Sequence, residues 1–208
     1  MFTSQQEIEQ WPLTFETLGN SNTQLRPGDV KYKDLNGDNV INWRDQKGIG
    51  KGTTPHAFFG LNIGLGYKNF DLAMLFQGAF AYNTNVTANG NTSSYCNNYW
   101  HETRNNKADA LFPRPSGSGT TNGLNSDYRN LRTSYMRLKY LSVGYQIPTS
   151  LLSKIGVEKC RLYLAGTNFF TISTLDKYSL DPEVNEERSN GYYYPQQFTM
   201  SVGCSFTF

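Results

Sequence analysis

The last eleven residues of the chain alternate strictly between apolar side chains and small or polar ones. The apolar positions are Phe198, Met200, Val202, Cys204, Phe206 and Phe208. A repeat of two residues predicts a β-strand that has one face in an apolar medium. Two kinds of structure satisfy this pattern, namely a lipid-facing strand of a membrane barrel and an amphipathic strand of a soluble sandwich.

Alternation of the same kind predicts a β-hairpin over residues 59–77. Its apolar face is carried by residues 59–67 and 70–77, and the dipeptide between them, Lys68-Asn69, has the length of a tight hairpin turn. The other face carries mainly glycine, asparagine, aspartate and glutamine. These residues suit a water-filled lumen better than the core of a soluble protein.

Two further strands are expected, over residues 135–147 and 161–171. In the first of them the apolar positions change parity, which predicts a β-bulge near Lys139 or Tyr140. The sequence TSLLSKIGVEK between the two strands predicts a short helix or turn. Aromatic residues gather near the strand ends, as they do in the interfacial girdles of membrane barrels.

The connections between the five strands alternate between short and long. The long ones are polar and span about residues 82–133 and 172–197, lengths that are uncommon in compact soluble domains. Short periplasmic turns and long extracellular loops are typical of outer-membrane barrels. We therefore predict an all-β fold, an antiparallel transmembrane β-barrel segment with its C-terminus in the periplasm.

Five strands cannot close a membrane barrel, because bacterial barrels have about eight strands or more. We therefore expect about five C-terminal strands of a larger barrel over residues 56–208, preceded by an extracellular loop region over residues 1–55. The N-terminal sequence MFTSQQEIEQWP has neither a basic region nor an apolar core. A secretion signal is therefore expected to lie outside this chain.

The composition narrows the class of protein further. Of the 208 residues, 14% are aromatic and 19 are glycine, a mixture that favours strands over helices. No apolar run reaches about 18 residues, so no transmembrane helix is predicted. The mean hydropathy of -0.57 is compatible with barrel strands. A formal net charge of only +2 argues against a nucleic-acid partner.

The segment DLNGDNVINWRD carries oxygen-bearing groups at the spacing of an EF-hand-type calcium loop. Positions 1, 3, 5, 7, 9 and 12 of such a loop correspond to Asp34, Asn36, Asp38, the carbonyl group of Val40, Asn42 and Asp45. Two positions depart from the standard loop, because Asn39 replaces the usual glycine and an aspartate replaces the usual final glutamate. The alternatives are one structural Ca2+ ion and a polar turn without metal.

Residue patterns typical of an enzyme are not evident. The two histidines, His56 and His101, belong to no metalloprotease, hydrolase or phosphate-binding motif. Adjacent acids such as Glu186 and Glu187 diverge on an extended chain and cannot flank a glycosidic bond. Three widely spaced cysteines argue against a zinc site or a disulfide framework. We therefore expect a protein that is not an enzyme.

Aromatic residues in the long loops are candidate contacts for a ligand or a partner. Tyr95, Tyr99 and Trp100 form one such group, and aromatic rings of this kind either stack on sugars and pack against partners or stabilise their own loop. At the end of the chain, Phe206 and Phe208 are candidates for the C-terminal aromatic signal that directs barrel assembly.

The chain resembles the C-terminal part of a SusC/RagA-type TonB-dependent outer-membrane transporter. The resemblance covers nearly the whole chain and rests on segments that occur in a fixed order: RPGDVKYKDLNGDNVIN, FFGLNIGLGYKNFDLAMLFQGAF, SYMRLKYLSVGYQIP, LLSKIGVEKCRLYLAGTNFFTI, SLDPEV and YYYPQQFTMSVGCSFTF. It implies a plugged barrel of about 22 strands in the outer membrane of a Gram-negative cell.

The same resemblance implies partners and a cargo. These are a SusD-like surface lipoprotein that covers the barrel, outer-membrane lipid, and an oligosaccharide or peptide substrate. The TonB complex would be engaged through an N-terminal part that this chain lacks, together with the plug. Two alternatives remain beside this interpretation, a soluble calcium-binding β-sandwich that recognises carbohydrate and a β-rich hydrolase.

Overall fold

The computed structural model describes residues 1–86, 99–103, 109–116, 120–152, 156–183 and 196–208. These residues belong to two compact units. The first unit is built from Met1–Lys51 and Asn83–Leu131, and the second from Gly52–Tyr82, Arg132–Val184 and Tyr194–Phe208. No helix in the described ranges is both long and apolar enough to cross a membrane.

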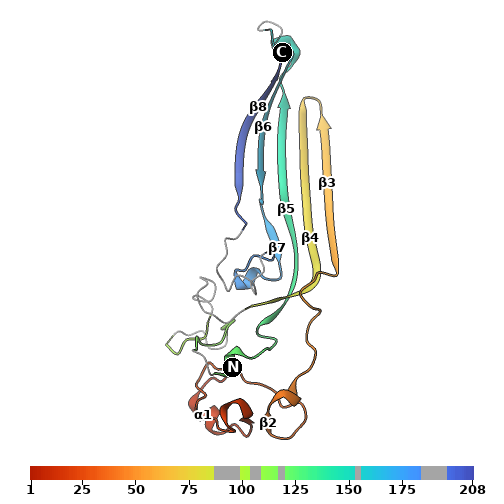
Figure 1. Ribbon diagram of the computed structural model, residues 1–208. Helices are drawn as coiled ribbons and strands as arrows, with labels where there is room; N and C mark the ends of the chain where they lie inside the picture. Colours follow the sequence, from red (N-terminus) through yellow and green to blue (C-terminus); the bar gives the residue numbers. More distant parts are fainter. Residues whose placement is uncertain (87–98, 104–108, 117–119, 153–155, 184–195) are drawn as a thin grey trace. The chain divides into compact units, whose positions relative to one another are not determined.

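The second unit is a single open sheet (Figure 1). Its strands, in spatial order, are β3 (Ala57–Tyr67), β4 (Phe70–Asn85), β5 (Asn130–Gln146), β6 (Lys159–Thr167) and β8 (Thr199–Thr207), and the short β7 (Thr171–Ser173) pairs with β5. The pairs β3–β4, β5–β6, β5–β7 and β6–β8 are antiparallel. The five predicted strands and the all-β class are thus confirmed.

The predicted hairpin turn is confirmed at its expected position. Tyr67 faces Phe70 in the register of β3 and β4, which leaves Lys68 and Asn69 as the turn. Lys68 adopts a left-handed φ of 54°, a conformation that tight hairpin turns require. At the opposite end of the sheet, β4 and β5 extend well beyond the residues that the alternation predicts.

The pairing of β5 is irregular at the level at which a bulge is predicted. Five steps along β5, from Tyr135 to Tyr140, face six steps along its neighbour, from Ser173 to Thr167. The segment between β6 and β7 therefore carries one residue more than the part of β5 that it faces, and Asn168 in this segment has a left-handed φ of 55°. β5 itself also changes parity here, because its buried positions are odd up to Arg137 and even at Ser142 and Gly144, which agrees with the irregularity predicted near Lys139 or Tyr140.

Short elements connect and precede the long strands. The predicted helix after β5 is α3 (Thr149–Leu152), and β7 is followed by the 3-10 turn η5 (Asp176–Tyr178). The first unit contains α1 (Gln5–Glu9), β1 (Thr14–Phe15), η1 (Glu16–Leu18), β2 (Val40–Ile41), η2 (Trp43–Asp45) and η3 (Thr121–Gly123). In it β1 and β2 pair in parallel.

The core of the first unit is small and aromatic. Phe2, Ile8, Phe15, Leu25 and Ile41 are buried together, and partly buried aromatic residues pack around them. In the second unit, the described strands all belong to one sheet. This single layer differs from the two packed layers of a β-sandwich.

Candidate functional site

One face of the sheet exposes a broad set of apolar side chains. Seven of them, with exposed fractions from 41% to 81%, are Leu61, Leu65, Val143, Leu162, Leu164, Met200 and Val202. The strand register places Leu164 directly opposite Val202, so these two side chains share a face. Exposed apolar patches of this extent mark a surface that contacts lipid or another protein.

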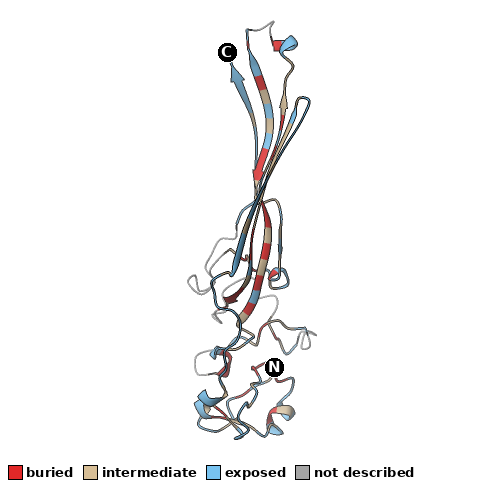
Figure 2. Cartoon of the chain, turned by 90° about the vertical axis from the view of Figure 1, so that its right-hand side faces the viewer, coloured by how far each residue is buried: buried red, intermediate tan, exposed pale blue. Residues whose placement is uncertain are grey.

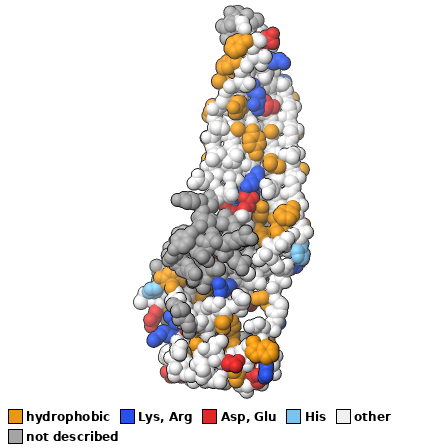
Figure 3. Space-filling model, viewed as in Figure 1, with side chains coloured by type: hydrophobic (Ala, Val, Ile, Leu, Met, Phe, Trp, Pro, Cys, Tyr) orange, Lys and Arg blue, Asp and Glu red, His pale blue; other side chains and the backbone are white. Residues whose placement is uncertain are grey.

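The opposite face of the same strands is polar. On the face shown in Figure 3, basic and acidic side chains lie next to each other over the sheet. Buried positions alternate with exposed or half-buried ones along much of β5 (Figure 2), as expected where successive side chains point to opposite faces. We refer to this side as the polar face.

An ion pair crosses the central strand on the polar face. The Arg161 guanidinium on β6 donates from Nε to Oδ1 of Asp71 at 2.9 Å and from Nη2 to Oδ2 at 2.5 Å. Asp71 belongs to β4, so the pair spans β5, where Gly144 lies beneath it. A Cβ atom at Gly144 would lie 2.3 Å from Oδ1 of Asp71 and 2.5 Å from Nε of Arg161. Only glycine leaves room for this contact.

We expect Gly144→Ala to displace the Asp71–Arg161 ion pair and to destabilise the folded barrel by about 1–3 kcal/mol, the usual cost of overpacking. The measurement is urea unfolding of the full-length protein in detergent micelles. Gly64→Ala is the matched control, because a Cβ at Gly64 meets no atom within 4 Å. Equal unfolding midpoints for the two variants would contradict the expectation.

A group of buried charges lies on the polar face near the middle of β5. Arg137 is 3% exposed, and its guanidinium donates to Asp181 Oδ1 at 2.8 Å and to Glu183 Oε2 at 2.8 Å. The Lys139 ammonium donates to the same Glu183 oxygen at 2.7 Å. We call Arg137, Lys139, Asp181 and Glu183 the charge cluster.

Neutral groups complete the hydrogen bonding of the charge cluster. Nε of Arg137 donates to Oγ1 of Thr171 at 2.6 Å, and the hydroxyl of Tyr135 donates to Oε1 of Glu183 at 3.1 Å. Buried charges are tolerated when each is paired and its remaining donors and acceptors are satisfied. Two cations and two anions therefore balance each other within the protein.

The charge cluster attaches a segment between β7 and β8 to the wall of the sheet. We call this segment, residues 174–183, the arch. Thr174 starts it with a backbone hydrogen bond to Ser134 O at 3.1 Å and a side-chain hydrogen bond to Arg132 O at 2.9 Å. Leu175 and Leu180 are buried within it, at 0% and 4% exposure.

The far end of the arch is also held by specific hydrogen bonds. The Tyr82 hydroxyl donates to the carbonyl oxygen of Pro182 at 2.7 Å. Oδ2 of Asp181, which the guanidinium leaves unused, accepts the backbone N–H of Gln196 at 2.9 Å. Asp181 thereby joins β5, the arch and the chain that leads into β8.

Sequence reasoning did not identify the charge cluster as a site. A signal was nevertheless present, because Arg137 and Lys139 are spaced by two residues, as are Asp181 and Glu183. That spacing places each pair on one side of an extended chain. The spacing within each pair does not indicate that the two pairs, which lie 44 residues apart in the sequence, contact each other.

The acidic loop over residues 34–45 forms a compact turn held by its own carboxylates. Asp34 accepts the backbone N–H groups of Asn36, Gly37 and Asn39 at 3.1, 2.6 and 2.9 Å. Hydrogen bonding by the Gly37 N–H lowers the pKa of Asp34, which keeps this carboxylate ionised. Asn39 adopts a left-handed φ of 65°, so it replaces the usual glycine without changing the turn.

The other expected ligands are in the same turn. Asp38 accepts the N–H of Val40 at 2.9 Å, and Asp45 accepts the N–H groups of Leu35 and Asn42, both at 2.8 Å. Within the described residues, no group of three or more histidine, cysteine, aspartate or glutamate side chains is arranged to hold a metal ion. Any cation here would depend on carbonyl, amide and water oxygens for most of its ligands.

The three candidate aromatic contacts have different positions. Tyr95 lies outside the described residues, whereas Tyr99 is partly exposed and its ring centroid lies 5.9 Å from that of His101. Trp100 is 4% exposed, and its ring covers Gly28, where a Cβ atom would lie 2.3 Å from a ring carbon. Trp100 is thus a core residue of the first unit, and Tyr99 is the more accessible of the two.

A buried ion pair in the first unit lies beside the tryptophan. Asp29 is 1% exposed, and its Oδ1 lies 2.7 Å from Nε of Arg114. The side-chain amide of Asn122 donates to the same oxygen at 2.8 Å. These contacts join segments more than 80 residues apart in sequence, which gives this loop-rich unit a defined structure.

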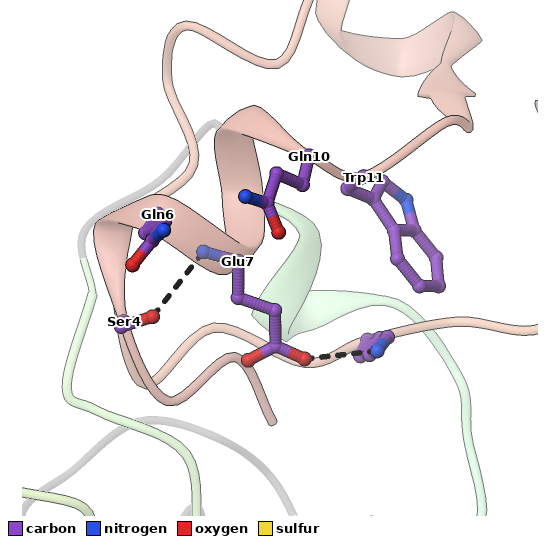
Figure 4. Close-up of a pocket in the computed structure, with 6 residues that line it drawn as sticks. Ser4, Gln6, Glu7, Gln10 and Trp11 are labelled. Carbon is purple, nitrogen blue, oxygen red and sulfur yellow. Dashed lines mark hydrogen bonds and ion pairs between the residues drawn. The ribbon is translucent and has the colours of Figure 1, made fainter.

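A shallow polar hollow lies beside α1 (Figure 4). Its centre is the ion pair between Lys31 Nζ and Glu7 Oε1 at 2.9 Å, and Lys31 also lies 4.3 Å from the centroid of the Trp11 ring. The backbone N–H of Thr3 and the Lys31 ammonium lower the pKa of Glu7 to about 2. Both charges and the accessible ring face are therefore engaged within the protein itself.

The candidate assembly signal lies on the apolar face. Phe206 is 50% exposed and Phe208 is 83% exposed, with ring centroids 6.4 Å apart. Phe206 faces Cys160 across β6 and β8. The terminal ring thus extends the apolar face to the end of the sheet at which the Lys68-Asn69 turn also lies.

Comparison with known sequences finds two bacterial relatives. The chain is 33% identical over 200 residues to TonB-dependent receptor P3 of Formosa agariphila, and 28% identical over 198 residues to TonB-dependent receptor P26 of the same organism. The alignments cover 88% and 87% of this chain but 19% and 20% of the relatives. The chain thus spans about a fifth of the curated relatives it matches, and both are receptors rather than enzymes. No protein-family model matches.

Comparison with solved structures finds chains of similar fold. A structure of the RagAB peptide transporter matches with a TM-score of 0.56 and 21% identity, over 82% of this chain and 19% of that one. The RagAB peptide importer in the open-open state matches with a TM-score of 0.53 and 20% identity, over 85% and 20%. The open antiparallel sheet therefore has the fold of part of such a barrel.

Proposed function

The comparisons confirm the resemblance to SusC/RagA-type TonB-dependent transporters, and on this premise we propose that the chain forms part of the wall of an outer-membrane transport barrel. The apolar face contacts lipid and the polar face lines the lumen. The observation that carries this proposal is the difference between the two faces of one sheet. One face exposes apolar side chains such as Val202, whereas the other carries buried ion pairs. A water-soluble protein would have to cover the first face.

The substrate and partners follow from the same premise. We propose that the complete transporter imports peptides or oligosaccharides together with a SusD-like surface lipoprotein, and that a TonB complex supplies energy through a part absent from this chain. The peptide transporter named among the structural relatives supports the peptide class. The end of the sheet at which Ala57 pairs with Phe80 would then be extracellular and the Lys68-Asn69 turn periplasmic.

The chain produced by itself is expected to require detergent. Among the described strands, β3 and β8 are the edges of the sheet, and in lipid each unpaired backbone group costs several kcal/mol. Size-exclusion chromatography with and without detergent provides the measurement, and liposomes that contain the chain should take up no substrate. A monodisperse monomer in plain buffer would instead favour the soluble carbohydrate-binding alternative.

We also propose that the loop over residues 34–45 binds one Ca2+ ion on the extracellular side. Support comes from the EF-hand-type spacing and from a turn that already holds Asp34, Asp38 and Asp45 in one compact loop. The role of the ion would be structural, since it would stiffen a surface loop near the lipoprotein. Extracellular calcium is plentiful enough for a site of about millimolar affinity.

Replacing Asp34 and Asp38 by alanine is expected to abolish calcium binding and to loosen the loop without affecting the barrel. Calorimetric titration of the full-length transporter with CaCl2 provides the test. Glu9→Ala, which removes an exposed acid outside the loop, is the control for nonspecific electrostatics. Identical isotherms for the wild type and the double variant would leave only a polar turn.

A further inference from the structure

We propose that the arch is a fixed constriction inside the transport pathway, held against the barrel wall by the charge cluster. The inference rests on the function proposed above, because that function places the polar face in the lumen. It differs from the expectation that residues 172–197 form a loop outside the barrel. Residues 174–183 instead turn back onto the polar face of β5, beside β7 (Figure 1).

The arch is attached to the wall along its whole length. At its start Thr174 continues the pairing of β7 with β5, and in its interior Leu175 and Leu180 are buried. At its end Asp181 and Glu183 reach the two cations of β5. A mobile loop, by contrast, has few buried contacts and many exposed hydrogen bonds.

The charge cluster makes release of the arch a single cooperative event. Oε2 of Glu183 accepts from both Arg137 and Lys139, and Oδ1 of Asp181 accepts from Arg137 and from the backbone N–H of Glu183. Lifting the arch would break the contacts to Arg137 and Lys139 together and leave Arg137 without a counter-ion in a buried position. Removing the partner of a buried charge is strongly unfavourable, so the arrangement with the arch bound to β5 dominates.

The side of the arch that faces away from the wall is polar. Asp176, Lys177 and Ser179 are exposed, and Lys177 Nζ lies 4.7 Å from the centroid of the Tyr178 ring. In a lumen, these are the groups that a passing solute would meet. The arch thus narrows the pathway with an exposed polar surface. The residues that fix its position, those of the charge cluster, differ from the residues that a solute would meet.

Accessibility of the arch to reagents of two sizes tests the proposal. The full-length transporter is displayed on intact cells, with Cys96, Cys160 and Cys204 replaced by serine and Lys177→Cys introduced. A small maleimide dye and a bulky polymer-coupled maleimide are the probes. We expect the dye to react, and the bulky reagent to react at least about tenfold more slowly than at an Asn36→Cys site in the exposed acidic loop.

Neutralising the anions of the cluster should remove this difference. In the Asp181→Asn/Glu183→Gln background, labelling of Lys177→Cys by the bulky reagent is expected to rise at least about tenfold. Asp71→Asn is the matched control, because it neutralises the other ion pair of the polar face and leaves the arch contacts intact. Fast bulky labelling in the unmodified cluster, or no rise on neutralisation, would overturn the inference.

Failure of this inference and failure of the proposed function give different results. Folded outer-membrane barrels migrate differently on gels before and after heating, so the wild type and each variant are checked in this way. A wild type without such a shift contradicts the barrel itself. A folded barrel with a freely labelled arch contradicts only the constriction.

Discussion

Replacing Val202 by arginine is expected to destabilise the assembled barrel by about 2–4 kcal/mol, the cost of a cation on the lipid face near the bilayer midplane. Val202 is 81% exposed and lies opposite Leu164 on the apolar face. The bilayer therefore offers the new guanidinium neither water nor a counter-ion. Urea unfolding of the full-length transporter in lipid vesicles measures the change.

The neighbouring position provides the control for this effect. Ser201→Arg places the same cation one residue earlier, on the polar face, where a water-filled lumen can hydrate it. We expect an unfolding midpoint close to that of the wild type. Equal destabilisation by both substitutions would show that the two faces do not differ in their surroundings.

Replacing Arg137 by methionine is expected to cost about 3–5 kcal/mol, because it leaves the buried Asp181 and Glu183 carboxylates with too little positive charge. Lys139 then remains as the one cation of the charge cluster and contacts only Glu183. The unfolding free energy of the full-length protein in micelles is the appropriate measurement.

Arg132→Met removes a guanidinium from the same strand at an exposed position. Its cost should be within about 0.5 kcal/mol of zero, as for most surface substitutions. A similar loss in the two arginine variants would indicate that the effect comes from β5 in general and not from the cluster.

The regular part of the fold was predictable because side chains in a strand repeat every two residues. The β3–β4 hairpin and its turn at Lys68 follow from that repeat alone. The ends of the long strands do not, since β4 continues to Asn85 through Ala81, which has a left-handed φ of 60°. A local change of this kind interrupts the alternation without ending the strand.

The charge cluster could not be predicted for a different reason. Its cations come from β5 and its anions from the arch. Hydrogen bonds between residues 44 or 46 positions apart produce no recognisable pattern in the local sequence. Trp100 illustrates the same limit, because the sequence alone predicts that an aromatic residue in a polar loop contacts a ligand. In the structure, the ring of Trp100 instead packs over Gly28.

The link between Asp181 and Gln196 has a consequence for the order of folding. Pairing β8 directly with β6 joins Thr167 to Thr199, 32 residues apart, whereas Asp181 and Gln196 are 15 residues apart. If the arch docks first, the closing loop is roughly halved, and its entropic cost falls by about 0.6 kcal/mol. The last strand would then join the sheet from a chain already anchored nearby, so disruption of the cluster should slow refolding of β8 as well as lower stability.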